Sequence, residues 1–129
     1  MAHNGTPLLL LIDDEPAQRR LVSALSARSG WRTIFANDAE SAIATLGTQD
    51  GMRLDAVLID QWSPQIKPAD LITEMRERRP KLPILVLTAH NNVLDAVEAM
   101  RAGATDYLAK PIAPDRLLAA LNATLDDCE

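Results

Sequence analysis

Two adjacent carboxylates, Asp13 and Asp14, directly follow the apolar run 8–12, which has the composition of a short buried strand. A third carboxylate, Asp60, ends a second apolar run at 56–59. Carboxylates gathered where buried strands end repel each other unless a positive charge lies between them. A hard divalent cation would relieve this repulsion, because Mg²⁺ prefers a few carboxylates together with water and a phosphate oxygen. The three aspartates therefore predict a magnesium site.

Two further apolar runs end in residues suited to phosphoryl transfer. The run 84–87 ends in Thr88, and the segment 106–109 is followed by Lys110 and Pro111. An aspartate can act as a nucleophile and form an acyl phosphate. Phosphoryl transfer then needs mainly positioning and charge neutralisation. Lys110 would supply a point charge and Thr88 a hydroxyl for one phosphoryl oxygen, so the four strand ends together predict a site for this chemistry.

Helical spacing of apolar residues follows each of these four strands and also follows the alternating segment 31–36, which predicts five alternating strand–helix units. Strands that are continuous apolar runs with helices between them indicate a parallel sheet covered on both faces. Five units are too few for an eight-fold barrel, so the prediction is an α/β fold with a doubly wound sheet. Ligands in such sheets bind at the carboxyl ends of the strands, where the polar residues fall. The strands are expected at 8–12, 31–36, 54–60, 83–89 and 106–110.

Size and composition fit one globular domain spanning residues 1–129, with residues 1–6 expected to be disordered. A formal net charge of −5 argues against direct nucleic-acid binding, which needs clustered Lys and Arg. No apolar stretch approaches the roughly 18 residues that cross a membrane, and no secretory signal is visible. The single cysteine, Cys128, cannot form an internal disulfide. We therefore expect a cytoplasmic protein.

Four sequence motifs now point to a family. They are LLLLIDDEP with its acidic pair, VLIDQWSP around Asp60, VLTA with Thr88, and DYLAKP with Tyr107 and with Lys110 before its proline. With these motifs, the chain resembles the receiver domain of bacterial two-component response regulators over essentially its whole length. The segment 88–112 looks most similar to receivers of transcription activators of the nitrogen-regulation type. The resemblance implies a flavodoxin-like (βα)5 fold with strand order 2-1-3-4-5.

The same resemblance implies roles for the acidic residues. Asp60 would accept a phosphoryl group from a histidine kinase or a histidine phosphotransfer protein. Mg²⁺ would be bound by Asp14, Asp60 and the backbone carbonyl of Trp62, with Asp13 assisting, often through water.

The resemblance also implies a switch and an output surface. Thr88 and Tyr107 match the switch pair of the family, and the peptide bond before Pro111 is expected to be cis. The fourth of the five predicted helices, the last strand and the last helix would form the face that changes on phosphorylation. An effector domain, a partner protein or a second copy of the chain would dock there.

The predicted function is a phosphorylation-dependent signalling switch that assists its own phosphorylation and dephosphorylation but is not a turnover enzyme. One alternative is a phosphatase with an aspartate nucleophile, although such enzymes use Asp-x-Asp and a cap domain. A flavodoxin is another, although the acidic run 13–15 would repel a flavin phosphate. A third alternative is a pseudo-receiver that docks partners without being phosphorylated.

Overall fold

The computed structural model describes residues 6–13, 15–61, 68–88, 93–109 and 113–126, with the backbone alone described at a few of them, Thr88 included. This part of the chain folds into five strands and six helices. Their bounds in chain order are β1 Leu8–Ile12, α1 Pro16–Arg28, β2 Arg32–Ala36, α2 Ala39–Leu46, α3 Gln49–Met52, β3 Ala56–Gln61, α4 Pro68–Arg78, β4 Ile84–Thr88, α5 Val93–Ala102, β5 Asp106–Ala109 and α6 Pro114–Asp126.

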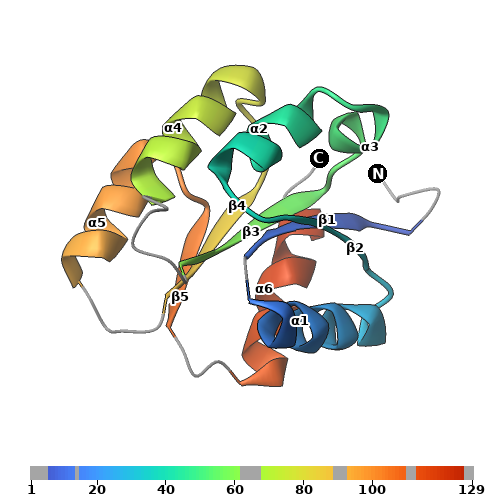
Figure 1. Cartoon of the computed structure of the whole chain (residues 1–129). Helices are drawn as coiled ribbons and strands as arrows, with labels where there is room; N and C mark the ends of the chain where they lie inside the picture. The colour runs from blue at the N-terminus through green and yellow to red at the C-terminus, as the bar shows by residue number, and fades with distance from the viewer. Residues whose placement is uncertain (1–5, 14, 62–67, 89–92, 110–112, 127–129) are drawn as a thin grey trace.

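The strands form one sheet in the order β2-β1-β3-β4-β5, and all neighbouring strands are parallel. This confirms the predicted fold class and strand order. Helices α1 and α6 cover one face of the sheet, and α2, α4 and α5 cover the other (Figure 1). Because every strand points the same way, the carboxyl ends of all five meet at one edge.

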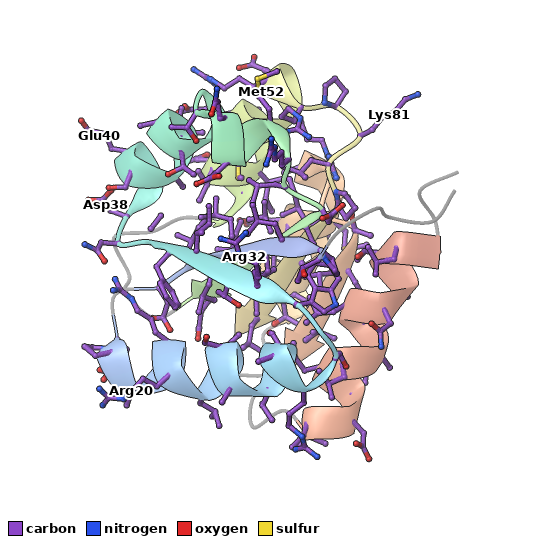
Figure 2. The ribbon with its side chains drawn as sticks, turned by 90° about the vertical axis from the view of Figure 1, so that its right-hand side faces the viewer. Arg20, Arg32, Asp38, Glu40, Met52 and Lys81 are labelled. Atoms are coloured by element: carbon purple, nitrogen blue, oxygen red, sulfur yellow. The ribbon has the colours of Figure 1, made fainter. Side chains whose placement is uncertain are left out.

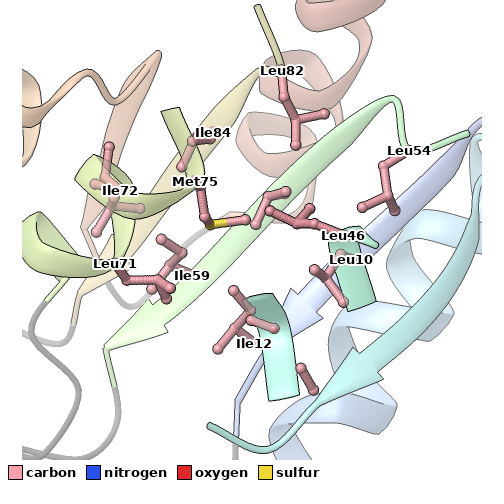
Figure 3. Close-up of a cluster of buried hydrophobic side chains, with 14 of the residues drawn as sticks. Leu10, Ile12, Leu46, Leu54, Ile59, Leu71, Ile72, Met75, Leu82 and Ile84 are labelled. Atoms are coloured by element: carbon pink, nitrogen blue, oxygen red, sulfur yellow. The ribbon is translucent and has the colours of Figure 1, made fainter. Parts of the chain in front are cut away.

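Strand alternation divides the core into two apolar layers. Leu10 and Ile12 of β1 point toward α2 and α4 and pack with Ile72 and Met75 (Figure 3). Leu9 and Leu11, the intervening residues, pack instead in the cluster that contains residues of α1 and α6. These four side chains are completely buried, which explains why β1 is a continuous apolar run rather than an alternating one.

The structure differs from the sequence prediction at α1 and α3. The spacing of Leu21, Val22 and Leu25 in the sequence predicts that all three belong to the apolar stripe of α1. Leu21, however, is 54% exposed, whereas Val22 and Leu25 are buried against the sheet. The short helix α3 was not predicted at all. Among the described residues, no helix has both the length and the apolar character needed to cross a membrane.

Candidate functional site

Asp13 and Asp60 lie at the carboxyl-terminal edge of the sheet, on adjacent strands. Ile12 of β1 is in register with Ile59 of β3, and each aspartate directly follows one member of this pair. The Asp13 amide donates to the carbonyl of Ala36, 3.0 Å away, which continues the ladder with β2 past the end of β1. Both aspartates are fully buried. The fold therefore brings two of the predicted site carboxylates into the same buried region.

Local hydrogen bonds fix the orientation of Asp13. Its Oδ1 accepts a hydrogen bond of 2.9 Å from the amide of Glu15, the residue that caps α1. Its backbone carbonyl accepts a hydrogen bond of 2.8 Å from Arg19 Nε, and the Arg19 guanidinium lies 5.6 Å from the centre of the Phe35 ring. Pro16 suits the first turn of α1, where its missing N–H is not needed. The start of α1 thus holds the chain that leaves β1.

Arg19 is a site neighbour that sequence reasoning did not identify. It lies on α1, six residues after Asp13, and it donates to the main-chain oxygen of Asp13 rather than to the Asp13 carboxylate. No residue-type pattern encodes a bond to a backbone carbonyl. The only signal in the sequence is the spacing of six residues between Asp13 and Arg19. At this spacing, a residue in the first turns of a helix can lie next to the end of the strand that precedes the helix.

Thr88 and Tyr107, the predicted switch pair, lie on the neighbouring strands β4 and β5. The backbone of Thr88 ends β4 in register with Gln61 and with Ala109. Tyr107 is in register with Val86, two positions earlier, and its half-buried side chain packs against the apolar layer under α2, α4 and α5. The backbone therefore places Thr88 at the same edge of the sheet as the aspartates, with Tyr107 further back.

Four of the predicted site residues fall outside the described part of the chain. They are Asp14, Trp62, Lys110 and Pro111. Their predicted roles in metal binding, charge neutralisation and the cis peptide bond remain predictions. Residues 1–5 are likewise outside the described part, so the expected disorder of residues 1–6 is also untested.

The donor atoms present fit a hard divalent cation. Two buried carboxylates at adjacent strand ends supply the oxygen ligands that Mg²⁺ prefers, and Mg²⁺ usually binds through only one or two carboxylates plus water and phosphate. Within the part of the chain that the structure describes, no group of three or more His, Cys, Asp or Glu side chains is placed to hold a metal ion. Asp14, the third predicted carboxylate, lies outside the described residues.

Comparison with known proteins agrees with this arrangement of strands. The family model described as the response regulator receiver domain matches residues 9–122. The probable transcriptional regulatory protein TcrX of Mycobacterium tuberculosis is 35% identical over 95% of this chain and 51% of its own length. The regulatory protein AtoC of Escherichia coli is 35% identical over 84% of this chain and 23% of its own length. The chain thus spans about half of TcrX, and less of AtoC.

Solved structures give the same result for the fold. The receiver domain of NtrX from Brucella abortus superposes with a TM-score of 0.81 at 31% identity, covering 92% of this chain and 98% of that one. A response regulator receiver domain protein from Clostridium thermocellum has a TM-score of 0.84 at 26% identity, covering 93% and 94%. Because the family model covers most of the sequence and receiver domains superpose along nearly all of it, the chain belongs to the response regulator receiver domain family.

Proposed function

We propose that Asp60 is the phosphoacceptor of a phosphorylation-dependent signalling switch. The observation that carries this proposal is the pairing of a fully buried Asp60 with a fully buried Asp13 at one edge of a receiver-domain sheet. Burial at a strand end fixes the Asp60 carboxylate within a rigid scaffold and limits competing water. The phosphoryl donor would be a phosphohistidine of a histidine kinase or of a histidine phosphotransfer protein.

The proposed chemistry is an in-line displacement at phosphorus. An Asp60 carboxylate oxygen forms the new bond to phosphorus while the bond to the donor nitrogen breaks. That nitrogen keeps the electron pair, and the donor leaves as neutral imidazole because the other ring nitrogen of the phosphohistidine is protonated. Asp13, Asp14, Asp60 and the backbone carbonyl of Trp62 would hold a Mg²⁺ ion, which supplies positive charge to the phosphoryl oxygens when bound. Lys110 would add a second positive charge, and the Thr88 hydroxyl would donate to one phosphoryl oxygen.

The proposed output runs through the face made by α5, β5 and α6. A hydrogen bond from Thr88 to the phosphoryl group would favour a packing in which the Tyr107 ring turns inward, so phosphorylation shifts a population between two states. Val97 and Met100 are large apolar side chains exposed on α5, which supports docking of an effector or of a second copy on this face. We also propose that residues 1–129 hold one receiver domain and that it acts in the cytoplasm.

The alternatives are less well supported. A phosphatase with an aspartate nucleophile belongs to another family than the one matched here, and a docking-only pseudo-receiver would have no use for two adjacent buried carboxylates. The domain would therefore assist its own phosphorylation and dephosphorylation without turning over a separate substrate.

Incubation with Mg²⁺ and acetyl phosphate should add one phosphoryl group to the chain. The measurement is intact-protein mass, followed by fragmentation of the peptide that contains β3 after reduction of the acyl phosphate with borohydride. Excess chelator should prevent the gain, because the charge of the incoming phosphoryl group would no longer be neutralised. Absence of any gain at high donor concentration would contradict the proposed function, and steady release of phosphate without labelling would favour the phosphatase.

Mg²⁺ binding should change the fluorescence of Trp62, which is two residues from Asp60. Trp31, the other tryptophan, is buried directly before β2 at the opposite edge of the sheet, so Trp31→Phe removes its background. In that background, Asp13→Asn should weaken the Mg²⁺ response by roughly tenfold or more, because one of the oxygen donors loses its charge. An unchanged Mg²⁺ affinity in Asp13→Asn would exclude Asp13 from the metal site.

A further inference from the structure

An open groove lies between α2 and α4, on the face of the sheet that is opposite to α1 and α6. Its volume is about 670 Å³. Its apolar lining comes from Ala39, Ile43, Ala44 and Leu71, and its charged lining from Glu40, Asp70 and Glu74. Leu71 is buried and Ala39 and Ile43 are half-buried, whereas Ala44 and the three carboxylates are exposed. We call this feature the acidic groove.

The parts of α2 and α4 that line the acidic groove carry no positive charge of their own. Neither segment 39–46 nor segment 68–74 contains a lysine or an arginine. The carboxylate of Glu74 lies 3.8 Å from the Arg78 guanidinium, but both side chains are about half exposed, so this pair is weak. Among the described residues, Glu40 and Asp70 form no ion pair. Within the part of the chain that the structure describes, two of the three carboxylates therefore face solvent without a cation.

The nearby arginines of α4 and its following loop are directed elsewhere. Arg76 Nε donates to the carbonyl of Gly103, 2.9 Å away, between α5 and β5. Arg79 Nη1 donates to the carbonyl of Gly51 in α3, at 2.5 Å. Both bonds hold the guanidinium groups at the far end of α4, away from its first turns. The negative charge of the acidic groove is therefore not balanced by these residues.

Further negative charge lies at the start of α2. Asp38 caps this helix, and a hydrogen bond of 2.7 Å from the backbone amide of Ser41 holds the pKa of the Asp38 carboxyl below its usual value. Asp38 and Glu40 project into solvent on the same side of the molecule, while Lys81 projects from the other side (Figure 2). Glu40 and Asp70 lie in the first turns of their helices, where a negative charge also stabilises the helix by interacting with its dipole. The helix dipole does not explain why Glu74, in the second turn, is acidic or why the groove has an apolar lining.

We propose that the acidic groove binds a cationic amphipathic segment of a partner protein. Apolar side chains of the segment would pack on Ile43 and Leu71, and its Lys or Arg residues would lie against Glu40 and Asp70. A helix laid in a groove between two helices is a common way to recognise such a segment. Nucleic acid is disfavoured because its phosphates would be repelled.

This docking site is separate from the proposed phosphoacceptor. Asp60 follows Leu58 by two residues on β3, which places it on the α1 and α6 face of the sheet. The acidic groove is on the opposite face, and none of the described residues that line it belongs to the proposed phosphoacceptor site. A failure of phosphorylation would therefore not contradict the docking proposal, and a failure of peptide binding would not contradict the proposed phosphoacceptor.

The test uses the complete chain and a fluorescein-labelled synthetic peptide with Leu and Ile on one helical face and Lys and Arg on the other. Fluorescence anisotropy at low salt should show saturable binding. Amide shifts in a ¹⁵N spectrum should centre on Ile43 and Leu71. The double variant Glu40→Gln/Asp70→Asn should bind about tenfold more weakly, because two exposed ion pairs are lost.

The matched control is Glu98→Gln/Asp115→Asn, which makes the same charge change at exposed positions of α5 and α6. It should bind the peptide as tightly as the unmodified chain. Equal weakening by both double variants would show a response to net charge and would overturn the proposal. Equal binding of a peptide with Glu in place of its Lys and Arg, or amide shifts confined to α1 or α6, would also overturn it.

Discussion

Asp60→Asn should abolish the phosphoryl mass gain that Mg²⁺ and acetyl phosphate produce in the unmodified chain. Asparagine has nearly the same shape as aspartate, so the buried position on β3 remains filled and the fold should be retained. The amide, however, is not a nucleophile that can form an acyl phosphate. The expected result is therefore a folded protein with no labelling, measured by intact mass with circular dichroism as the check on folding.

Two further variants make this result specific. Asp115→Asn, an exposed position in the first turn of α6, should be labelled like the unmodified chain. Asp13→Asn should still be labelled, but more slowly, because asparagine Oδ1 can keep the hydrogen bond from Glu15 while the charge is lost. Undiminished labelling of Asp60→Asn would place the nucleophile at another residue and would contradict the proposed function.

The positions of Asp13 and Asp60 could be predicted because their signal is local and strong. Each follows a continuous apolar run, and a parallel sheet brings the carboxyl ends of its strands to one edge regardless of the conformation of the loops. The strand order came from the resemblance to a family rather than from the pattern of apolar residues, and the structure confirms it. The chemical roles of the two aspartates stay predictions.

Other features could not be predicted because they depend on tertiary contacts. Leu21 has the right spacing for the apolar stripe of α1, yet α1 is oriented so that Val22 and Leu25 face the sheet and Leu21 faces solvent. The spacing of apolar residues alone does not determine which of two neighbouring residues faces the sheet. Trp31 was included in the second strand, but it precedes β2 and its indole packs in the layer under α1 and α6, with Nε1 donating to Asn122 at 3.5 Å.

Helix α3 is the element that the sequence least suggests. Its four residues, QDGM, include a glycine and an aspartate, which favour turns over helices. Thr48 starts the helix by accepting a hydrogen bond of 3.0 Å from the amide of Gly51, and Arg79 donates to the Gly51 carbonyl. The helix is therefore held by a side-chain cap and by an arginine that is distant in sequence, neither of which a periodicity template detects.

Gly51→Ala should be among the most destabilising single substitutions in this domain. A Cβ added at Gly51 would lie 2.0 Å from the carbonyl oxygen of Thr45 and 2.7 Å from Cα of Leu46. Both atoms belong to the backbone of α2, so no side-chain rotation can relieve the clash. Overpacking usually costs about 1–3 kcal/mol, and a clash with backbone should reach or exceed the upper end of that range. That is a large share of the ~5–15 kcal/mol that stabilises a typical domain.

Gly47→Ala is the matched control, four residues earlier at the end of α2. Its φ is −85°, which any residue adopts, and a Cβ there would meet its nearest neighbour, the carbonyl oxygen of Ala44, at an ordinary 3.6 Å. Alanine at such a site changes stability by less than about 1 kcal/mol and can raise it by restricting the unfolded chain. Urea unfolding followed by circular dichroism should therefore show a midpoint close to that of the unmodified chain for Gly47→Ala and a much lower one for Gly51→Ala. Equal midpoints for the two variants would mean that α3 shifts away from α2 at little cost, and that its close packing contributes little to the stability of the fold.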